Sequence, residues 1–152
     1  MLEKSLEILS HNRQMFKDFL TKFTLNELNT IPKGFNNNIF WNIAHCMVSF
    51  QRLVYHYSGL PIGIPEKWMR QYNKGTAPTV PITQKDVDEL IALFDTNYTQ
   101  LLEDLDKGMF NDYAPYTTST KMELRSVEDA IMFCLVHEGL HVGSVLALAK
   151  QI

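Results

Sequence analysis

The apolar residues of this chain recur with the period of an α-helix in four separate stretches. In residues 2–23 they recur every three or four positions, with charged residues on the opposite side. The same single-face pattern follows a capping signal at Thr83–Asp86 and ends at Gly108. Residues 39–58, and a last stretch that follows Ser126 and runs to the C-terminus, are apolar over more of their circumference. This pattern predicts four long helices.

Two longer connections separate the last three of these helices. Residues 61–82 contain four of the six prolines, with room for one helical turn at 66–72, and residues 109–125 show no regular period. A capping-box spacing at Thr24–Glu27 indicates a short helical turn after the first helix. We expect an all-α fold, a four-helix bundle with long connections between helices two and three and between helices three and four. The chain has the length of one domain, which we expect to span residues 1–152.

Composition and charge narrow the possible function classes. The net charge of −3 does not supply the positive surface that nucleic-acid binders use, so we expect no nucleic-acid partner. The longest uninterrupted apolar run, Ile131–Val136, is far shorter than the roughly 20 residues that cross a bilayer, and the first residues do not resemble a signal peptide. Cys46 and Cys134 both fall within apolar helical patterns, which is typical of reduced thiols. We therefore expect a cytoplasmic protein without a membrane segment.

The last helix combines an apolar surface with two histidines. Between residues 130 and 149 its only charged side chain is Glu138, so we expect protein to surround this helix. His137 and His141 are one helical turn apart, which brings their Cβ atoms to about 5–6 Å on one face. Two such imidazoles can bind one metal ion. The alternative is that each ring is a core residue hydrogen-bonded to a backbone carbonyl. We favour the metal site, because two unpaired imidazoles so close together would be costly.

A metal site needs at least one more ligand, which must come from another helix. His11 lies on the polar face of the first helix, and we expect it to face solvent. His45 and His56 share a face of the second helix but lie about 16 Å apart along it, too far to bind one ion together. His45 is central in its helix, as His137 and His141 are in theirs, and is therefore the candidate third ligand.

His45 belongs to a polar stripe on the second helix, which also contains Asn42, Ser49, Arg52 and His56. Such a stripe can simply face water. It can also line a wet groove inside the bundle, because apolar residues cover about two-thirds of this helix, more than a surface helix needs. In that case Arg52 and His56 would lie along a substrate path, and Arg52 becomes a candidate for a catalytic role. Both alternatives stay open at this point.

Residues 137–141 read His-Glu-Gly-Leu-His, which matches the zinc-peptidase motif H-E-x-x-H. Those enzymes usually take their third ligand from downstream, and no His, Asp or Glu follows His141. No strand pattern upstream could align a peptide, so the motif alone does not indicate a peptidase. Glu138 could support the metal ligands, act as a catalytic base or form an ion pair, which is the commonest role. Cys134 could be a fourth ligand, although a small core residue is the commoner outcome.

The combination and order of these motifs resemble the DinB-like superfamily of four-helix bundles. The sequence Trp-Asn-Ile-Ala-His at 41–45 is similar to the second-helix motif of that family. Residues 137–144 resemble its H-x-x-H-H-x-G-Q stretch, and residues 72–78 are similar to segments found between its second and third helices. Leu140 and Ser144 depart from the family pattern, at positions that are not expected to be ligands. The resemblance therefore covers nearly the whole chain.

This resemblance implies a ligand set and an assembly. It implies that His45, His137 and His141 bind one divalent ion, typically nickel or zinc, within the bundle. It also implies a homodimer. Some members of the family that the chain resembles are thiol transferases or thiol-dependent isomerases, and many are labelled metal-dependent hydrolases.

Three histidines leave at least one coordination position open, as in catalytic rather than structural metal sites. The ion could activate a water molecule or present a low-molecular-weight thiol to an electrophile. We therefore expect a metal-dependent hydrolase or thiol transferase that acts on a small molecule, with Glu138 and Arg52 as candidate catalytic residues. The competing hypothesis is a non-catalytic metal-binding or interaction bundle, whose ion would have a structural or sensing role.

Overall fold

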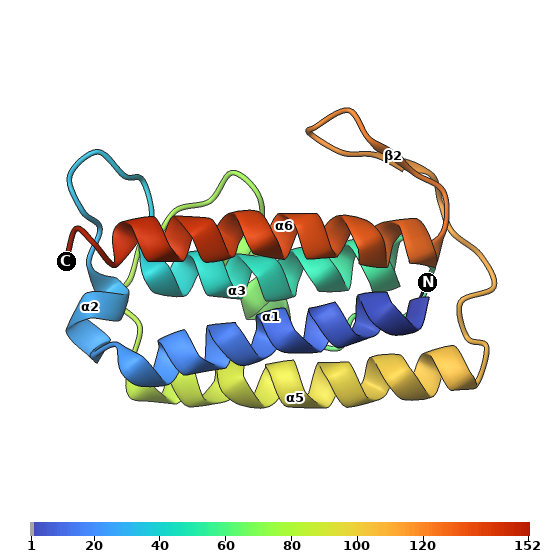
Figure 1. Ribbon diagram of the computed structural model, residues 1–152, viewed down its shortest axis with the longest axis horizontal. Coiled ribbons are helices and arrows are strands. Elements are labelled where there is room, and N and C mark those ends of the chain that lie inside the picture. The colour runs from blue at the N-terminus through green and yellow to red at the C-terminus, as the bar shows by residue number, and fades with distance from the viewer. Residues whose placement is uncertain (1) are drawn as a thin grey trace.

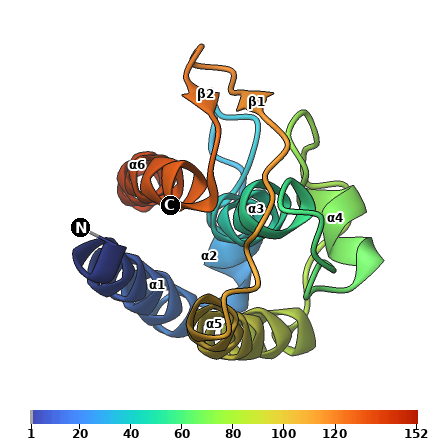
Figure 2. The same ribbon diagram turned by 90° about the vertical axis from the view of Figure 1, so that its right-hand side faces the viewer.

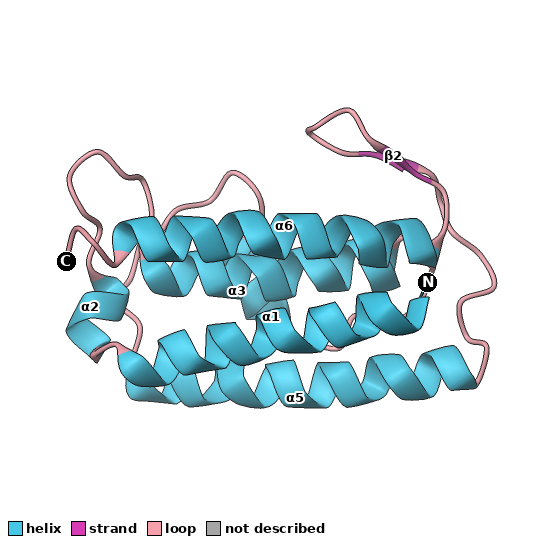
Figure 3. Ribbon diagram, viewed as in Figure 1, coloured by secondary structure: helices cyan, strands magenta, loops and turns pink. Residues whose placement is uncertain are grey.

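Four long helices run side by side along the molecule in the computed structural model, which describes residues 2–152 (Figure 1). These helices are α1 (Leu2–Lys22), α3 (Ile39–Phe50), α5 (Gln84–Asp106) and α6 (Val127–Leu148). Helix α6 contacts α1 and α3, and α5 contacts the same two helices from the other side (Figure 2). Nearly all of the regular structure is helical (Figure 3). The predicted all-α four-helix bundle is therefore confirmed.

The capping signals read from the sequence are formed in the structure. The short α2 (Leu25–Asn29) begins at Thr24, whose backbone N–H donates to the Glu27 carboxylate while its hydroxyl accepts from the Glu27 backbone N–H. An equivalent capping box at Thr83 begins α5. Just after the end of α5, Gly108 has a φ of 64°, a left-handed conformation that glycine adopts without strain. Local sequence chemistry thus sets the helix ends.

The core of the bundle lies around α3. All residues of this helix except Ser49 are buried. The first long connection contains α4 (Glu66–Tyr72), as the sequence predicted, and α4 packs its aromatic side chains onto α3. The Phe40 ring lies 6.0 Å from the Trp68 ring and 5.7 Å from the Tyr72 ring, measured between centroids. Polar residues on α3 therefore lie inside the molecule, and the site is built around them.

The second long connection contains a small hairpin that the sequence did not predict. Its strands, β1 (Tyr116–Thr117) and β2 (Glu123–Leu124), pair antiparallel. Strands of two residues are too short to produce a readable alternation of apolar and polar positions. In the end view the hairpin lies on the side of the bundle where α3 and α6 are neighbours (Figure 2). It therefore covers the region next to the histidines of these two helices.

The second long helix is not a regular α-helix to its end. Beyond Phe50 the chain forms a π-helical segment, η1 (Gln51–His56), and the backbone N–H of Tyr57 donates to the carbonyl of Arg52 at 3.3 Å. A π-helix rotates less per residue than an α-helix, so an α-helical wheel misplaces the residues that follow. His56 is exposed, whereas His45 is 7% exposed. His56 is the last residue of this π-helical segment, so an α-helical wheel does not fix its direction relative to His45.

The expectation that protein surrounds the last helix is also wrong for the single chain. One face of α6 packs on α1 and α3, but the opposite face is open and apolar. Its large exposed apolar side chains are Met132 (43%), Val136 (62%), Leu140 (64%) and Leu146 (48%). The reason is that a helix of a four-helix bundle contacts two neighbours and keeps an outer face. By length and hydropathy alone α6 would also suit a membrane span, a test that core helices pass as well.

Candidate metal centre

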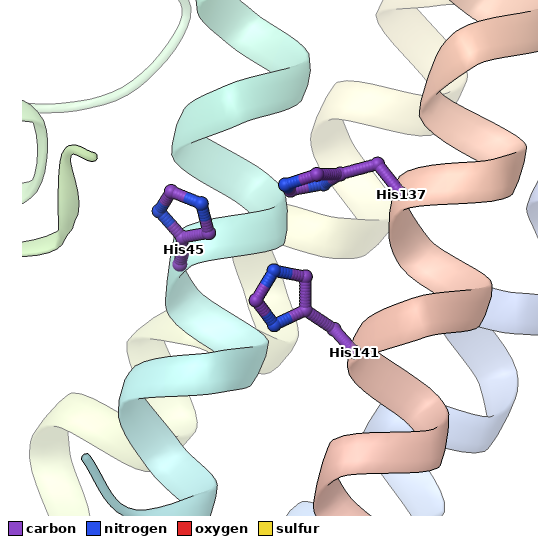
Figure 4. Close-up of side chains that lie close together, drawn as sticks. All are labelled: His45, His137 and His141. Atoms are coloured by element: carbon purple, nitrogen blue, oxygen red, sulfur yellow. The ribbon is translucent and has the colours of Figure 1, made fainter. Parts of the chain in front are cut away.

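Three histidine side chains meet between α3 and α6 (Figure 4). His45 comes from the middle of α3, and His137 and His141 come from successive turns of α6. One ring nitrogen from each lies within 4.8 Å of those of the other two. The ring centroids are 5.2 Å apart for His45 and His137, 5.1 Å for His45 and His141, and 4.6 Å for His137 and His141. The structure thus brings together the three predicted ligands, which can hold one metal ion.

Two of the three rings are fixed by hydrogen bonds on the nitrogen that faces away from the cluster. The Nδ1–H of His45 donates to the backbone carbonyl of Tyr72 at 2.7 Å, at the C-terminal end of α4. The Nδ1–H of His141 donates to Oδ1 of Asn42 at 2.8 Å. Because a carbonyl and an amide oxygen can only accept, each Nδ1 carries the hydrogen and each Nε2 keeps its lone pair. This is the arrangement that orients histidines for metal binding.

Asn42 is itself held in place. Its side-chain amide group donates to Oδ1 of Asn37 at 3.0 Å and to the backbone carbonyl of Asn38 at 2.8 Å. These bonds turn the Asn42 oxygen toward His141, so the amide orientation is determined by its partners. The sequence placed Asn42 in the polar stripe but gave no sign that it supports a histidine 99 residues further along the chain.

Burial keeps the three imidazoles neutral. Burial, together with a smaller contribution from the nearby His45 ring, lowers the pKa of His137 to about 4. The pKa of His141 falls to about 3, again mainly through burial, with contributions from His137 and His45. Burial also lowers the pKa of His45. At neutral pH all three imidazoles are therefore in the neutral form, which leaves one ring nitrogen with a free lone pair, as a metal ligand must have.

Aromatic side chains stack on two of the three imidazole rings. The Trp41 ring stacks on His45 with 4.7 Å between centroids and an angle of 7°, and its Nε1–H donates to the Thr76 hydroxyl. Phe133 stacks on His137 at 6.3 Å. Each aromatic precedes its histidine by four residues, so the helical spacing was a readable signal for these supports. The rings are therefore restrained in position without an ion.

The residues of the polar stripe on the second helix differ in their surroundings in the structure. Asn42 is buried behind His141, and the Ser49 hydroxyl lies 3.2 Å from Nε2 of His45. Arg52 is half-buried and lines a pocket of about 80 Å³ that His45 and His137 also line. These residues correspond to the groove alternative, whereas His56 faces solvent. The pocket gives the histidine cluster an opening.

The side chains of Glu138 and Cys134 do not join the histidine cluster. The Glu138 carboxylate is 1% exposed and lies 3.7 Å from Nε of Arg13 on α1, which corresponds to the ion-pair alternative. Burial raises the pKa of Glu138 to about 7. Cys134 lies in the apolar core, and burial raises the pKa of its thiol, which disfavours the thiolate that binds metals. His11 is exposed, as expected. A catalytic role of Glu138 stays a prediction.

Comparison with protein-family models places the chain in a known group. The model described as the DinB superfamily matches residues 8–145, which include the three histidines and all four long helices in whole or in large part. A comparison with curated proteins found no match.

Proposed function

The chain belongs to the DinB superfamily, and from this membership together with the histidine cluster we propose that it is a metal-dependent enzyme acting on a small molecule. His45, His137 and His141 would hold one divalent ion, nickel or zinc. The reaction is hydrolysis or the transfer of a thiol. The observation that carries the proposal is that two of the three clustered imidazoles, those of His45 and His137, line a pocket, so a bound ion would be reachable by a substrate.

The residues around the ion have distinct tasks in this proposal. A bound divalent ion would supply Lewis acidity, which activates water or a low-molecular-weight thiol as a nucleophile. Tyr72 and Asn42 hold the rings of His45 and His141 in the tautomer that leaves Nε2 free. Trp41 covers one side of His45 and excludes solvent from that side. The pocket lined by Ser49 and Arg52 receives the substrate.

Two other functions have less support. A zinc peptidase of the H-E-x-x-H type uses the glutamate of the motif at the metal, but the Glu138 carboxylate pairs with Arg13 on the α1 side of the helix. A purely structural ion would be enclosed by protein ligands. Here His45 and His137 line an open pocket, which favours a catalytic ion.

The proposal is tested by loading the protein with Ni²⁺ or Zn²⁺ and screening thiols paired with electrophiles beside a panel of hydrolase substrates. We expect turnover that requires the ion and is absent in His141→Ala. A Co²⁺-loaded sample supplies a second readout, because a thiol that enters an open position changes the visible absorption spectrum of the ion. Absence of turnover, together with a spectrum that neither thiols nor water-displacing anions change, would show a closed, non-catalytic site.

We also propose that the protein forms a homodimer through the exposed face of α6. Glu128 lies at the start of the apolar stripe on this face and Lys150 just beyond its end, and both are exposed. If two copies pair antiparallel by a two-fold axis near Gly139, opposite charges face each other at both ends. A Cβ added at Gly139 or Gly143 would meet no atom of another element within 4 Å, so this part of the face is open to a second helix.

The dimer is tested by light scattering on the parent and on Leu140→Glu, which puts a charge in the centre of the stripe. We expect a dimeric parent and a monomeric variant. A monomeric parent at micromolar concentration would contradict the dimer without affecting the metal site.

A further inference from the structure

The pocket beside the histidine cluster carries charge of one sign only. Its walls come from α3 and η1, from the loop that follows α4, from the hairpin and from α6. Among the described residues that line it, the only permanently charged side chains are Arg52 and Lys74, and no Asp or Glu is present. This is notable in a chain whose net charge is −3. The pocket therefore has a positive potential before any metal ion binds.

Neither of these basic groups is neutralised by the protein itself. The ion pairs found within residues 2–152 involve other lysines and arginines. Nη1 of Arg52 donates to the neutral side-chain oxygen of Asn73 at 3.1 Å. The same Asn73 oxygen accepts from the backbone N–H of Lys74 at 2.9 Å. Asn73 thus joins the segments that carry the two cations and orients the guanidinium without cancelling its charge.

The remaining donors of Arg52 are available to a ligand. A guanidinium has five N–H groups in a planar fork, which matches the two oxygens of a carboxylate. Ser49 and Ser119 add hydroxyls to the pocket wall. A volume of about 80 Å³ has room for a carboxylate and a few carbon atoms. A neutral imidazole site holding a divalent ion would add further positive charge next to this group.

We infer that the pocket binds the carboxylate of a small-molecule substrate, with Arg52 and Lys74 as the anion-binding residues and the reacting end directed to His45 and His137. This inference rests on the proposed function, because the reacting end needs the metal ion. It assigns a substrate class, small carboxylic acids, and gives Arg52 a binding role. Arg52 belongs to the π-helical segment η1, and such turns occur frequently at functional sites.

The inference is tested by titrating propionate and its neutral analogue propionamide into ¹⁵N-labelled protein, with and without Zn²⁺. We expect propionate, but not propionamide, to shift the Nε–H resonance of Arg52 and the backbone resonance of Lys74 in a saturable way. Arg52→Gln should weaken propionate binding about tenfold or more, because a charged hydrogen-bond partner is lost. Arg70→Gln is the matched control, since Arg70 is an exposed arginine paired with Glu66 on α4. Lys74→Met, at an exposed position, provides a second test if Arg52→Gln does not fold.

Zn²⁺ and Ni²⁺ content, measured first, separates the two proposals. If the parent binds neither Zn²⁺ nor Ni²⁺, the proposed function fails, while propionate shifts in the metal-free protein would still support the anion pocket. If Zn²⁺ binds but propionate and propionamide behave alike, only the anion pocket is overturned. Propionate binding that requires Zn²⁺ and is unchanged in both Arg52→Gln and Lys74→Met would also overturn it, because the ion alone would then hold the carboxylate.

Discussion

Helix α6 contributes neighbouring residues to two buried polar clusters that differ in kind. Toward α3, His137 joins the histidine cluster with His141 and His45. Toward α1, Glu138 faces Arg13, and we call these two residues the buried ion pair. The guanidinium of Arg13 also lies over the Phe50 ring, 4.1 Å from its centroid. Helix α6 thus contributes two imidazole bases to the cluster on its α3 side and a carboxylate, opposite a cation, on its α1 side.

The difference shows which cluster needs a ligand. In the buried ion pair the two charges compensate each other, although their polar atoms make no hydrogen bonds of ordinary geometry among the described residues. In the histidine cluster three neutral rings turn toward one another, and Nδ1 of His45 and Nδ1 of His141 are already bonded to oxygens behind them. The Ser49 hydroxyl, 3.2 Å from Nε2 of His45, is a neutral donor and does not supply the positive charge that converging lone pairs attract. A bound cation would complete the histidine cluster, whereas the buried ion pair is complete without one.

The largest expected effect is the loss of metal binding in His141→Ala. Removing one of three ligands leaves two imidazoles, and we expect no stoichiometric metal while the helical content stays close to that of the parent. Metal content is measured by mass spectrometry and helicity by circular dichroism. His56→Ala is the control, because His56 is an exposed histidine at the end of the same helical segment. Equal metal content in His141→Ala and the parent would refute the assignment.

The second effect concerns the buried ion pair and should appear in stability instead of metal binding. Glu138→Gln leaves the Arg13 charge buried without a counter-charge, which we expect to cost about 3–5 kcal/mol of unfolding free energy. Urea unfolding measures this cost. The double variant Arg13→Met with Glu138→Met should recover most of the loss, since apolar groups of similar volume replace a buried pair at little cost.

Metal stoichiometry decides whether the two clusters are independent. In the double variant it should equal that of the parent. If the double variant loses its metal while remaining folded, Glu138 takes part in the metal site, and the distinction between the clusters fails.

A smaller effect is expected for Asn42→Ala. This change removes the acceptor behind His141 but leaves all three ligands, so the metal affinity should fall by roughly 10–100-fold at unchanged stoichiometry. Competition with a chelator of known affinity measures the change. Asn73→Ala, which removes an asparagine outside this contact, should keep the parent affinity. An unchanged affinity in Asn42→Ala would mean that the hydrogen bond does not orient the ligand.

The smallest effect is the pH dependence of the metal-free protein. The pKa values of His137 and His141 are lowered to about 4 and about 3, so their contribution to stability is present above pH 6.5 and is lost as the pH falls toward those values. Glu138 changes the stability in the opposite direction. Because its pKa is raised to about 7, its contribution to the free energy of unfolding is lost as the pH rises. We expect a net loss on the order of 1 kcal/mol between pH 7 and pH 5.5.

Urea unfolding at several pH values tests this balance. The parent should lose stability on acidification, and the double variant without Glu138 should lose more, because the opposing group is gone. A parent that becomes more stable between pH 7 and pH 5.5 would contradict the pKa directions of the histidines.

The features that could be predicted from the sequence are those with a local signal. The four helices follow from apolar periodicity, and the capping boxes at Thr24 and Thr83 follow from residue spacing. Within the candidate site, the spacing of His137 and His141 identified two members from the sequence alone. His45 was the best remaining histidine by its position along the helix and by family resemblance.

The remaining features depend on contacts between distant segments or on backbone groups. The acceptor for His45 is the backbone carbonyl of Tyr72, which any residue would offer at that position. The pairing of Glu138 with Arg13 depends on how α1 lies against α6. The π-helical turn at η1 has no known sequence signal in this chain, and it changes the rotation per residue before His56, which an α-helical wheel takes to be constant.

The central claim is that three imidazoles from two helices share one cation, and X-ray absorption spectroscopy of the Ni²⁺-loaded protein tests it most directly. We predict three imidazole nitrogens at about 2.0–2.1 Å from a single ion, with the remaining positions occupied by solvent oxygen. The same measurement on His45→Ala should show a different ligand set or no bound ion. A parent spectrum with fewer than three imidazole ligands, or one that His45→Ala leaves unchanged, would contradict the account.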